Sequence, residues 1–504
     1  MTEAEIIKII EDLKIYKTET SKIEVKTASI DFPKKCYDTF SSFSNKYGGV
    51  ILFGINEEND FEVEGVYDLN DLQKKIASLC RDSMFPAIRP DIIPLKYEGK
   101  DVLAVKIDEL MQNKKPCYYI PKGLNKGSYT RVGDSDEVMT DYEIYALQSY
   151  NDHIFEDTRP TRRASIDDLN MEELTKYVNK LKEVKPNFAK NDFDRCLKLC
   201  SITDTSEENV YPTLAGTMIF GEYPQAYYPQ LFIACVVVPG IELGDTGAMG
   251  ERFIDNKRIE GTIEEMLTGA MNFLARNMKT SVIIDTNGQR INRTEYPLEA
   301  LREAIANALI HRDYSTQTEN AYVSVYMYND RIEIINPGIL YGTNKLEKLG
   351  TATTMESRNP TIVRILEEKG DVIENRHSGI PTMKREMKKF GLPKPEFYEE
   401  RDSFKVIFRN KVVVHHEQKN DTQSGQQSGQ QKFIITDYKT MVLRYCAIPR
   451  NAKEISEHLN IKSRQYISTN IIKPLINDGK LEYTNKNSVN ARNQKYVTVI
   501  NKNN

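Results

Sequence analysis

The stretch that decides the fold of the C-terminal half is "EALREAIANALIHRDY", residues 299–314. Its alanine, leucine and isoleucine residues surround most of a helix, which is the pattern of a buried helix. Glu303, Asn307 and His311 nevertheless follow one another at intervals of four residues, so they form one stripe along that helix. Buried polar side chains need partners. The stripe therefore predicts the wall of a polar site and not a solvated helix face.

The residue types in the stripe suit phosphoryl chemistry. A carboxylate can orient a water molecule toward a phosphoryl group, and an amide oxygen one helical turn further on can bind Mg²⁺. A strand pair is expected next, over "AYVSVYMYNDRIEIINPG" (321–338), and its second strand leads into "RIEIINPGILYG" (331–342), which carries two glycines. Glycine at such positions lets the backbone approach a ligand closely.

These segments together resemble a known group of ATPases. Glu303 and Asn307 match the E-x-x-x-N box of the GHKL ATPases, which include gyrase B, MutL and the histidine kinases. The segment 331–342 stands where that group has an Asp-x-Gly-x-Gly box. With "RNP" (358–360) and "RHSGIPTMKREMKKFGLPKPEF" (376–397), the C-terminal half looks like the divergent ATPase half of a bacterial family of RecG-related ATP-binding proteins and transcriptional regulators. Its members pair this half with an AlbA/Schlafen-like domain and often with a winged helix.

The resemblance implies an ATP site with Mg²⁺. Glu303 would be the water-orienting base and Asn307 the Mg²⁺ ligand. Asn336, Gly338 and Gly342 would form the adenine-side box, with Arg358, Ser378 and Gly379 near the phosphates. The sequence departs from the pattern twice, because Asn336 replaces an aspartate and His377 replaces the first glycine of the second glycine box.

The N-terminal segment carries a second set of motifs. "SKIEVKTASIDFPKKCYDTFSSFSNKYGGVILFGINEENDFEVEGV" (21–66) and "GSYTRVGDSD" (127–136) resemble the AlbA_2 domain shared with Schlafen proteins. That likeness implies nucleic-acid binding, for which we name four cations: Lys22, Lys26, Lys46 and Arg131. Glu24 and Lys26 lie on one face of a strand by its alternation.

A metal-dependent nuclease is an alternative function of this domain. Some Schlafen relatives cleave RNA with three acidic residues, two of them five positions apart. Glu19 and Glu24 repeat that spacing, Lys26 could stabilise phosphate charge, and Asn56 or Glu57 occupies the place of the third acid. An ordinary exposed Glu–Lys pair on a strand would explain the same residues.

The last 72 residues are basic. From Phe433 onward there are 12 Lys and Arg residues against 5 Asp and Glu, a net charge of +7, whereas the whole chain carries −4. Their apolar spacing favours a winged helix-turn-helix with wing strands at 479–484 and 494–499. Its DNA contacts would be Arg464, Gln465, Thr469 and Lys473. A winged helix that binds protein would show the same spacing.

Composition sets the remaining expectations. Hydrophobic residues make up 39% and charged residues 28% of the 504 residues, and seven scattered cysteines suit a reducing compartment, so we expect a cytoplasmic protein that contacts no membrane. "TLAGTMIFG" (213–221) and "QLFIACVVV" (230–238) are expected to be strands. The predicted domains are an AlbA_2/Schlafen-like α/β domain at 1–150, an α/β middle region at 151–290, a GHKL-like α/β sandwich at 291–412, a Gln/Ser/Gly-rich linker at 413–432 and a winged helix at 433–504.

The sequence thus predicts an α+β multidomain regulator of transcription that binds ATP and DNA, with RNA as a second candidate ligand and slow ATP hydrolysis as its candidate activity. Because the lid over the nucleotide couples to dimer geometry in related ATPases, a homo-oligomer is expected. Two alternatives stay open: a Schlafen-like nuclease acting in phage defence, and a catalytically inactive oligomeric scaffold.

Overall fold

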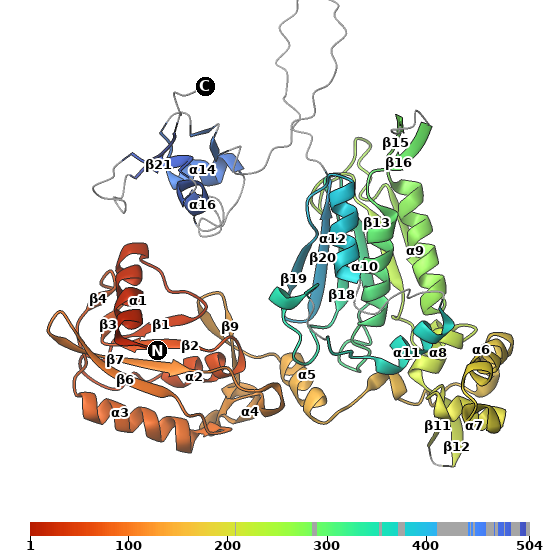
Figure 1. Cartoon of the computed structure of the whole chain (residues 1–504), viewed down its shortest axis with the longest axis horizontal. Helices are drawn as coiled ribbons and strands as arrows, with labels where there is room; N and C mark the ends of the chain where they lie inside the picture. The colour runs from red at the N-terminus through yellow and green to blue at the C-terminus, as the bar shows by residue number, and fades with distance from the viewer. Residues whose placement is uncertain are drawn as a thin grey trace, which may run out of the picture. The chain divides into compact units, whose positions relative to one another are not determined.

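The chain, seen in a computed structural model, divides into two compact units (Figure 1). Residues 19–410 form the first unit, and residues 2–18 group with residues 411–504 in the second. The structure describes all residues except 207, 285–289, 352–354, 371–378, 411–441, 444, 447–448, 460–467, 469–471, 478, 485–493 and 500–504.

A four-stranded sheet is the centre of residues 19–140. Its strand order is β1-β2-β7-β6, in which β1 is parallel to β2 and the other pairs are antiparallel. The sheet and its two helices are β1 (Ile23–Lys26), α2 (Cys36–Asn45), β2 (Gly49–Phe53), α3 (Leu69–Ser78), β6 (Asp91–Tyr97) and β7 (Lys100–Ile107). The smaller elements are β3 (Ile55–Asn56), β4 (Glu62–Val63), β5 (Met84–Phe85), β8 (Tyr118–Tyr119), α4 (Gly123–Gly127), β9 (Tyr129–Val132) and β10 (Ser135–Val138).

Aromatic side chains of α2 fill the core of this part. Phe40 and Phe43 are fully buried with Ile51 and Phe53 of β2. Gly49 makes this packing possible, because a Cβ atom there would stand 2.5 Å from the Phe43 ring.

A six-stranded mixed sheet is the centre of the remainder of the first unit. Its strand order is β14-β13-β17-β18-β20-β19, and helices α9, α10 and α12 lie side by side on one face (Figure 1). The elements are β13 (Ile233–Val237), β14 (Asp255–Ile259), α9 (Ile263–Asn277), α10 (Leu298–Ile310), β17 (Val323–Met327), β18 (Arg331–Pro337), α12 (Gly379–Lys389), β19 (Glu396–Glu399) and β20 (Ser403–Arg409). The strand pair expected over 321–338 is confirmed as antiparallel β17 and β18.

One hydrophobic core runs through residues 169–408. Strands β13 and β14 come from the predicted middle region, yet β13 pairs in parallel with β17 of the predicted ATPase region. A boundary at residue 290 therefore divides a single sheet. The flanking elements are α5 (Asp141–Asn151), α6 (Met171–Val184), α7 (Phe193–Leu199), β11 (Thr203–Ser206), β12 (Asn209–Pro212), α8 (Leu214–Phe220), β15 (Thr280–Ile284), β16 (Arg290–Thr294) and α11 (Pro360–Lys369).

The expectation of a strand at 213–221 is wrong. Residues Leu214–Phe220 form helix α8, whose N-terminus is capped by the Thr213 hydroxyl accepting from the Gly216 N–H at 3.0 Å. All seven residues of α8 are buried. A short, wholly apolar segment buried on every side has no periodicity that separates a helix from a strand, so the cap and the tertiary packing decide.

The second unit combines a helix near the N-terminus with elements of the C-terminal part of the chain. Helix α1 (Glu3–Tyr16) begins with a capping box between Thr2 and Glu5 and buries Ile6, Ile10 and Leu13. The described C-terminal elements are α14 (Ala452–Leu459), α16 (Lys473–Asn477), β21 (Leu481–Tyr483) and β22 (Tyr496–Thr498). The expected wing strands pair as antiparallel β21 and β22. By its contacts α1 groups with these elements and not with the domain expected over 1–150.

Candidate functional sites

The polar stripe of α10 faces a helix partner. Glu303 and Asn307 are half-buried, whereas Ala304, Ile305 and Ala306 between them are buried in the core. Helix α12 packs against α10 with its first residue, Gly379, at these two side chains. A Cβ atom at Gly379 would overlap Glu303 Oε1 and stand 2.9 Å from Asn307 Nδ2. The structure therefore brings together three of the residues expected at the phosphate end.

Asn336 is a buried polar residue of the central sheet. It sits on β18, where it is in register with Phe404 of β20, and it alternates with buried Ile332 and Ile334 on the face that the helices cover. Its side chain is 7% exposed, and its Oδ1 accepts no hydrogen bond from any residue that the structure describes. A buried acceptor of this kind is uncommon and calls for a ligand or a bound water.

The two glycines after Asn336 allow close contacts with neighbouring segments. Gly338 has φ +112°, and a Cβ there would stand 2.6 Å from Cβ of Asp313, just beyond α10. Gly342 has φ +63°, and a Cβ there would overlap the Glu356 carboxylate. Both positions need a left-handed backbone and lack room for a side chain, so glycine is required for local packing as well as for any ligand.

Arg358 is a buried clamp in this structure. Its guanidinium donates to Asp313 Oδ2 at 2.8 Å and to the Ile339 carbonyl at 2.8 Å, and lies 5.0 Å from the centre of the Tyr341 ring. It is 8% exposed. The guanidinium expected near the phosphates therefore binds the loop after β18 to the end of α10.

Asp313 joins three segments of the chain. Besides Arg358, it accepts from the Tyr142 hydroxyl of α5 at 2.7 Å and from the Ser315 N–H at 2.9 Å. Burial would raise the pKa of Asp313, but the Arg358 charge and these donors hold that pKa below its ordinary value. Burial and the Asp313 charge raise the pKa of Tyr142, so its hydroxyl stays protonated. Sequence reasoning missed Tyr142 because no local pattern connects residues 171 positions apart.

The other residues of "RDY" support the helix end. Arg312 is 2% exposed and donates to the carbonyls of Thr318 and Ala321. The Tyr314 hydroxyl donates to the Leu309 carbonyl at 2.7 Å. These contacts give the motif a structural role next to the stripe.

A second polar cluster lies in the N-terminal domain around Arg131. Its guanidinium, with 1% of the residue exposed, lies 2.8 Å from Glu24 Oε2, 2.9 Å from Asp136 Oδ1 and 4.0 Å from Glu19 Oε2. The Val25 N–H donates to Glu19 Oε1 at 2.6 Å. Burial, followed by the charges of Glu24 and Glu57, raises the pKa of Glu19 to about 8. The cluster thus holds a cation of the protein itself among its carboxylates.

Comparisons with known proteins identify both regions. Residues 19–140 match the family "Schlafen, AlbA_2", and residues 320–408 match the family "Putative ATP-dependent DNA helicase recG C-terminal". The chain is a RecG-related protein with a Schlafen AlbA_2 domain. Residues 146–234 match a domain of unknown function, DUF8451. No curated protein matches the sequence.

Two solved structures are similar to this RecG-related protein. The DIP2311 protein from Corynebacterium diphtheriae is 16% identical over 81% of this chain and 80% of its own, with a TM-score of 0.39. The N-terminal domain of an ATP-dependent DNA helicase RecG-related protein from Nitrosomonas europaea is 30% identical over 26% of this chain and 90% of its own, with a TM-score of 0.22.

The four cations expected to contact nucleic acid differ in how far their side chains are exposed to solvent. Arg131 is enclosed by its carboxylate partners and has no surface to offer a phosphate. Lys26 is half-buried and paired with Glu24, and Lys46 is half-buried with its ammonium 5.3 Å from the centre of the Tyr47 ring. Lys22 and Glu57 are exposed. Of the four cations named from sequence, Lys22 is thus the one with an open side chain.

Over the part of the chain that the structure describes, no three His, Cys, Asp or Glu side chains come close enough to hold a metal ion. No described helix combines the length and apolarity that a bilayer span requires. Ser378, Arg464, Gln465 and Thr469 lie outside the described residues, and Lys473 is the first residue of α16, with its ammonium 3.8 Å from the centre of the Tyr16 ring.

Proposed function

We propose that this RecG-related protein is an ATP- and nucleic-acid-binding regulator of transcription whose nucleotide site lies between α10, α12 and β18. The observation that carries the proposal is the unpartnered Oδ1 of Asn336 on the helix-covered face of β18. An unsatisfied buried acceptor costs about 1–3 kcal/mol. The amino group of adenine is a donor that would satisfy it.

The phosphate end is supported by α12 and the stripe of α10. A helix N-terminus favours anions because its first N–H groups have no partner within the helix. The N-terminus of α12 meets Glu303 and Asn307 through Gly379, a position with no room for a Cβ. Asn307 would hold Mg²⁺ through its amide oxygen, and Glu303 would orient a water molecule. Bound Mg²⁺ would supply neutralisation of phosphate charge.

A connection to the AlbA_2 domain supports a switch. The match to that domain ends at residue 140, and α5 begins at Asp141. Tyr142 of α5 contacts Asp313 and accepts from the Ile339 N–H at 3.3 Å, in the loop that follows Asn336. A ligand that moves this loop therefore has a direct contact through which to move α5.

The two alternative functions, a nuclease and an inactive scaffold, make different demands on the structure and on nucleotide binding. A nuclease needs carboxylates that are free to bind a metal, whereas Glu24 and Asp136 hold Arg131. An inactive oligomeric scaffold would bind no nucleotide.

The test is calorimetric titration of Mg·ATP into the full-length protein and three variants. Asn336→Leu removes the acceptor at similar volume, and its affinity is expected to fall about tenfold or more. Asn336→Asp is expected to bind at least as tightly as the wild type. Asn256→Leu, on the exposed surface of edge strand β14, is the matched control and is expected to bind normally. No binding by the wild type would overturn the proposal and favour the scaffold.

A further inference from the structure

The AlbA_2 domain carries an aromatic and basic surface formed by α2, the β5–β8 pair and the segment that follows β8. We propose that this surface, defined by Tyr37, Phe85, Tyr118, Tyr119 and Lys122, binds single-stranded nucleic acid by base stacking. The inference rests on the proposed nucleic-acid binding and names its ligand class and its contact residues.

Aromatic rings gather where α2 meets the β5–β8 pair. The rings of Tyr37 and Tyr119 stack with centroids 4.2 Å apart and planes 10° from parallel. Phe85 is paired in register with Tyr118, and their ring centroids are 5.6 Å apart. Phe85 is 57% exposed, so one ring of this group is open to solvent. An open ring face is what an unpaired base needs for stacking.

The two segments that carry the tyrosines of this surface are positively charged, which suits binding to a polyanion. Segments 33–37 ("PKKCY") and 118–126 ("YYIPKGLNK") contain four exposed lysines and no acidic residue; these lysines are Lys34, Lys35, Lys122 and Lys126. The Lys122 ammonium lies 4.8 Å from the centre of the Tyr37 ring and donates to the Tyr129 hydroxyl at 2.9 Å. Its cation therefore lies directly beside the rings, where the phosphate next to a stacked base would stand.

Buried polar groups of α2 hold the surface in place. Asn45 donates to the carbonyls of Cys117 and Tyr129 at 2.8 and 2.9 Å, and accepts from the Cys117 N–H at 2.6 Å. Ser41 donates to the same Cys117 carbonyl and accepts from the Tyr129 N–H at 2.9 Å. The segment from Cys117 to Tyr129 is thus tied to α2 at both ends. Rings held in this way lose little conformational entropy on binding.

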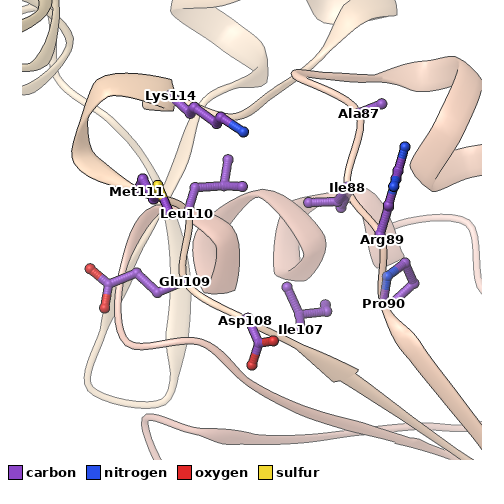
Figure 2. A pocket seen from close by; sticks show the side chains of 10 residues that line it. All are labelled: Ala87, Ile88, Arg89, Pro90, Ile107, Asp108, Glu109, Leu110, Met111 and Lys114. Atoms are coloured by element: carbon purple, nitrogen blue, oxygen red, sulfur yellow. The ribbon is translucent and has the colours of Figure 1, made fainter.

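A pocket of about 520 Å³ is lined by residues that lie close in the chain to strands β5 and β8 (Figure 2). It is lined by residues 87–90, which follow β5, and by residues that precede β8 in the chain. Figure 2 shows the side chains of Ile88, Ile107 and Leu110 in the pocket, with Arg89 and Lys114 among those that surround it. Asp108 and Glu109 line the same pocket, so two carboxylates balance its two cations, and it is the apolar walls that suit a base.

The test measures the binding of labelled oligothymidylate and oligouridylate to the full-length protein over a range of salt concentrations. Phe85→Ala is expected to weaken binding roughly 5- to 100-fold with an unchanged salt slope, because a stacking contact is lost. Lys122→Gln is expected to weaken binding and to reduce the salt slope by about 0.7, because one phosphate contact is lost. Lys96→Gln, an exposed lysine on β6, and Met249→Ala, a 93% exposed apolar side chain, are the matched controls.

Duplex DNA of matched length distinguishes stacking from general attraction, since Phe85→Ala is expected to leave duplex binding unchanged. If the wild type binds the single strands and both surface variants bind as it does, the surface assignment is overturned while nucleic-acid binding stands. If the wild type binds neither single strands nor duplex, the nucleic-acid part of the proposed function is itself overturned.

Discussion

The backbone of Gly379 lies against the carboxylate of Glu303, so closely that a single Cβ atom at Gly379 would overlap Glu303 Oε1. This relationship joins the first residue of α12 to the polar stripe of α10. The same contact therefore serves both the packing of α12 against α10 and the proposed nucleotide site.

Gly379→Ala is therefore expected to abolish Mg·ATP binding with a smaller effect on folding. The new methyl group displaces the ends of the Glu303 and Asn307 side chains, which are flexible and move at little cost in stability. Calorimetry and thermal unfolding check the two effects. Gly244→Ala, where an added Cβ meets open space, is the control. Normal nucleotide binding by Gly379→Ala would contradict the role assigned to this contact.

Asp313→Asn is expected to destabilise the first unit by about 3–5 kcal/mol. The substitution leaves the buried Arg358 guanidinium without its charged partner, and uncompensated buried charge is costly. Tyr142→Phe removes one hydrogen bond to Asp313 and is expected to cost about 0.5–1.5 kcal/mol. Denaturant unfolding of both single variants and the double variant measures the coupling. Additive effects would show that Tyr142 and Asp313 act independently.

Arg131→Met is expected to unfold the AlbA_2 domain selectively or to weaken it by several kcal/mol. The variant leaves Glu24 and Asp136 buried with their cation gone. Hydrogen exchange across residues 19–140 compared with residues 169–408 would locate the effect. A variant whose stability matches the wild type, but which binds nucleic acid weakly, would instead favour a direct phosphate contact by Arg131.

The stability of the AlbA_2 domain is expected to fall as pH rises from about 4.5 to 8. The pKa of Glu19 is about 8 in the folded domain and 4.5 when unfolded, so the folded state binds the additional proton over this interval. The stabilisation is complete below pH 4.5 and is lost as pH passes through 8. Glu19→Gln keeps an acceptor for the Val25 N–H and removes the titration. Thermal unfolding should show a flatter pH profile for Glu19→Gln, and an unchanged profile for the exposed control Glu58→Gln. Parallel profiles for the wild type and Glu19→Gln would exclude Glu19 as the titrating group.

Local sequence determined the elements whose patterns are strong. The all-round apolar helix with one polar stripe and the β17–β18 pair follow from periodicities that each segment carries within itself. The same patterns placed Glu303 and Asn307 on one face of α10. The apolar segment 213–221 lacks such a periodicity, and its helix depends on a cap and on burial from all sides.

Tertiary structure alone decided what those residues face. No spacing in the sequence could reveal that Arg358 forms an ion pair with Asp313, or that Tyr142 donates a hydrogen bond to the same carboxylate. Nor could it reveal that acidic side chains enclose Arg131, which leaves its guanidinium inaccessible to a phosphate. These outcomes depend on contacts between residues tens to hundreds of positions apart, where burial changes which charges need partners. The sequence thus determined the chemistry available to this protein, and the packing of distant segments decided which groups remain free to use it.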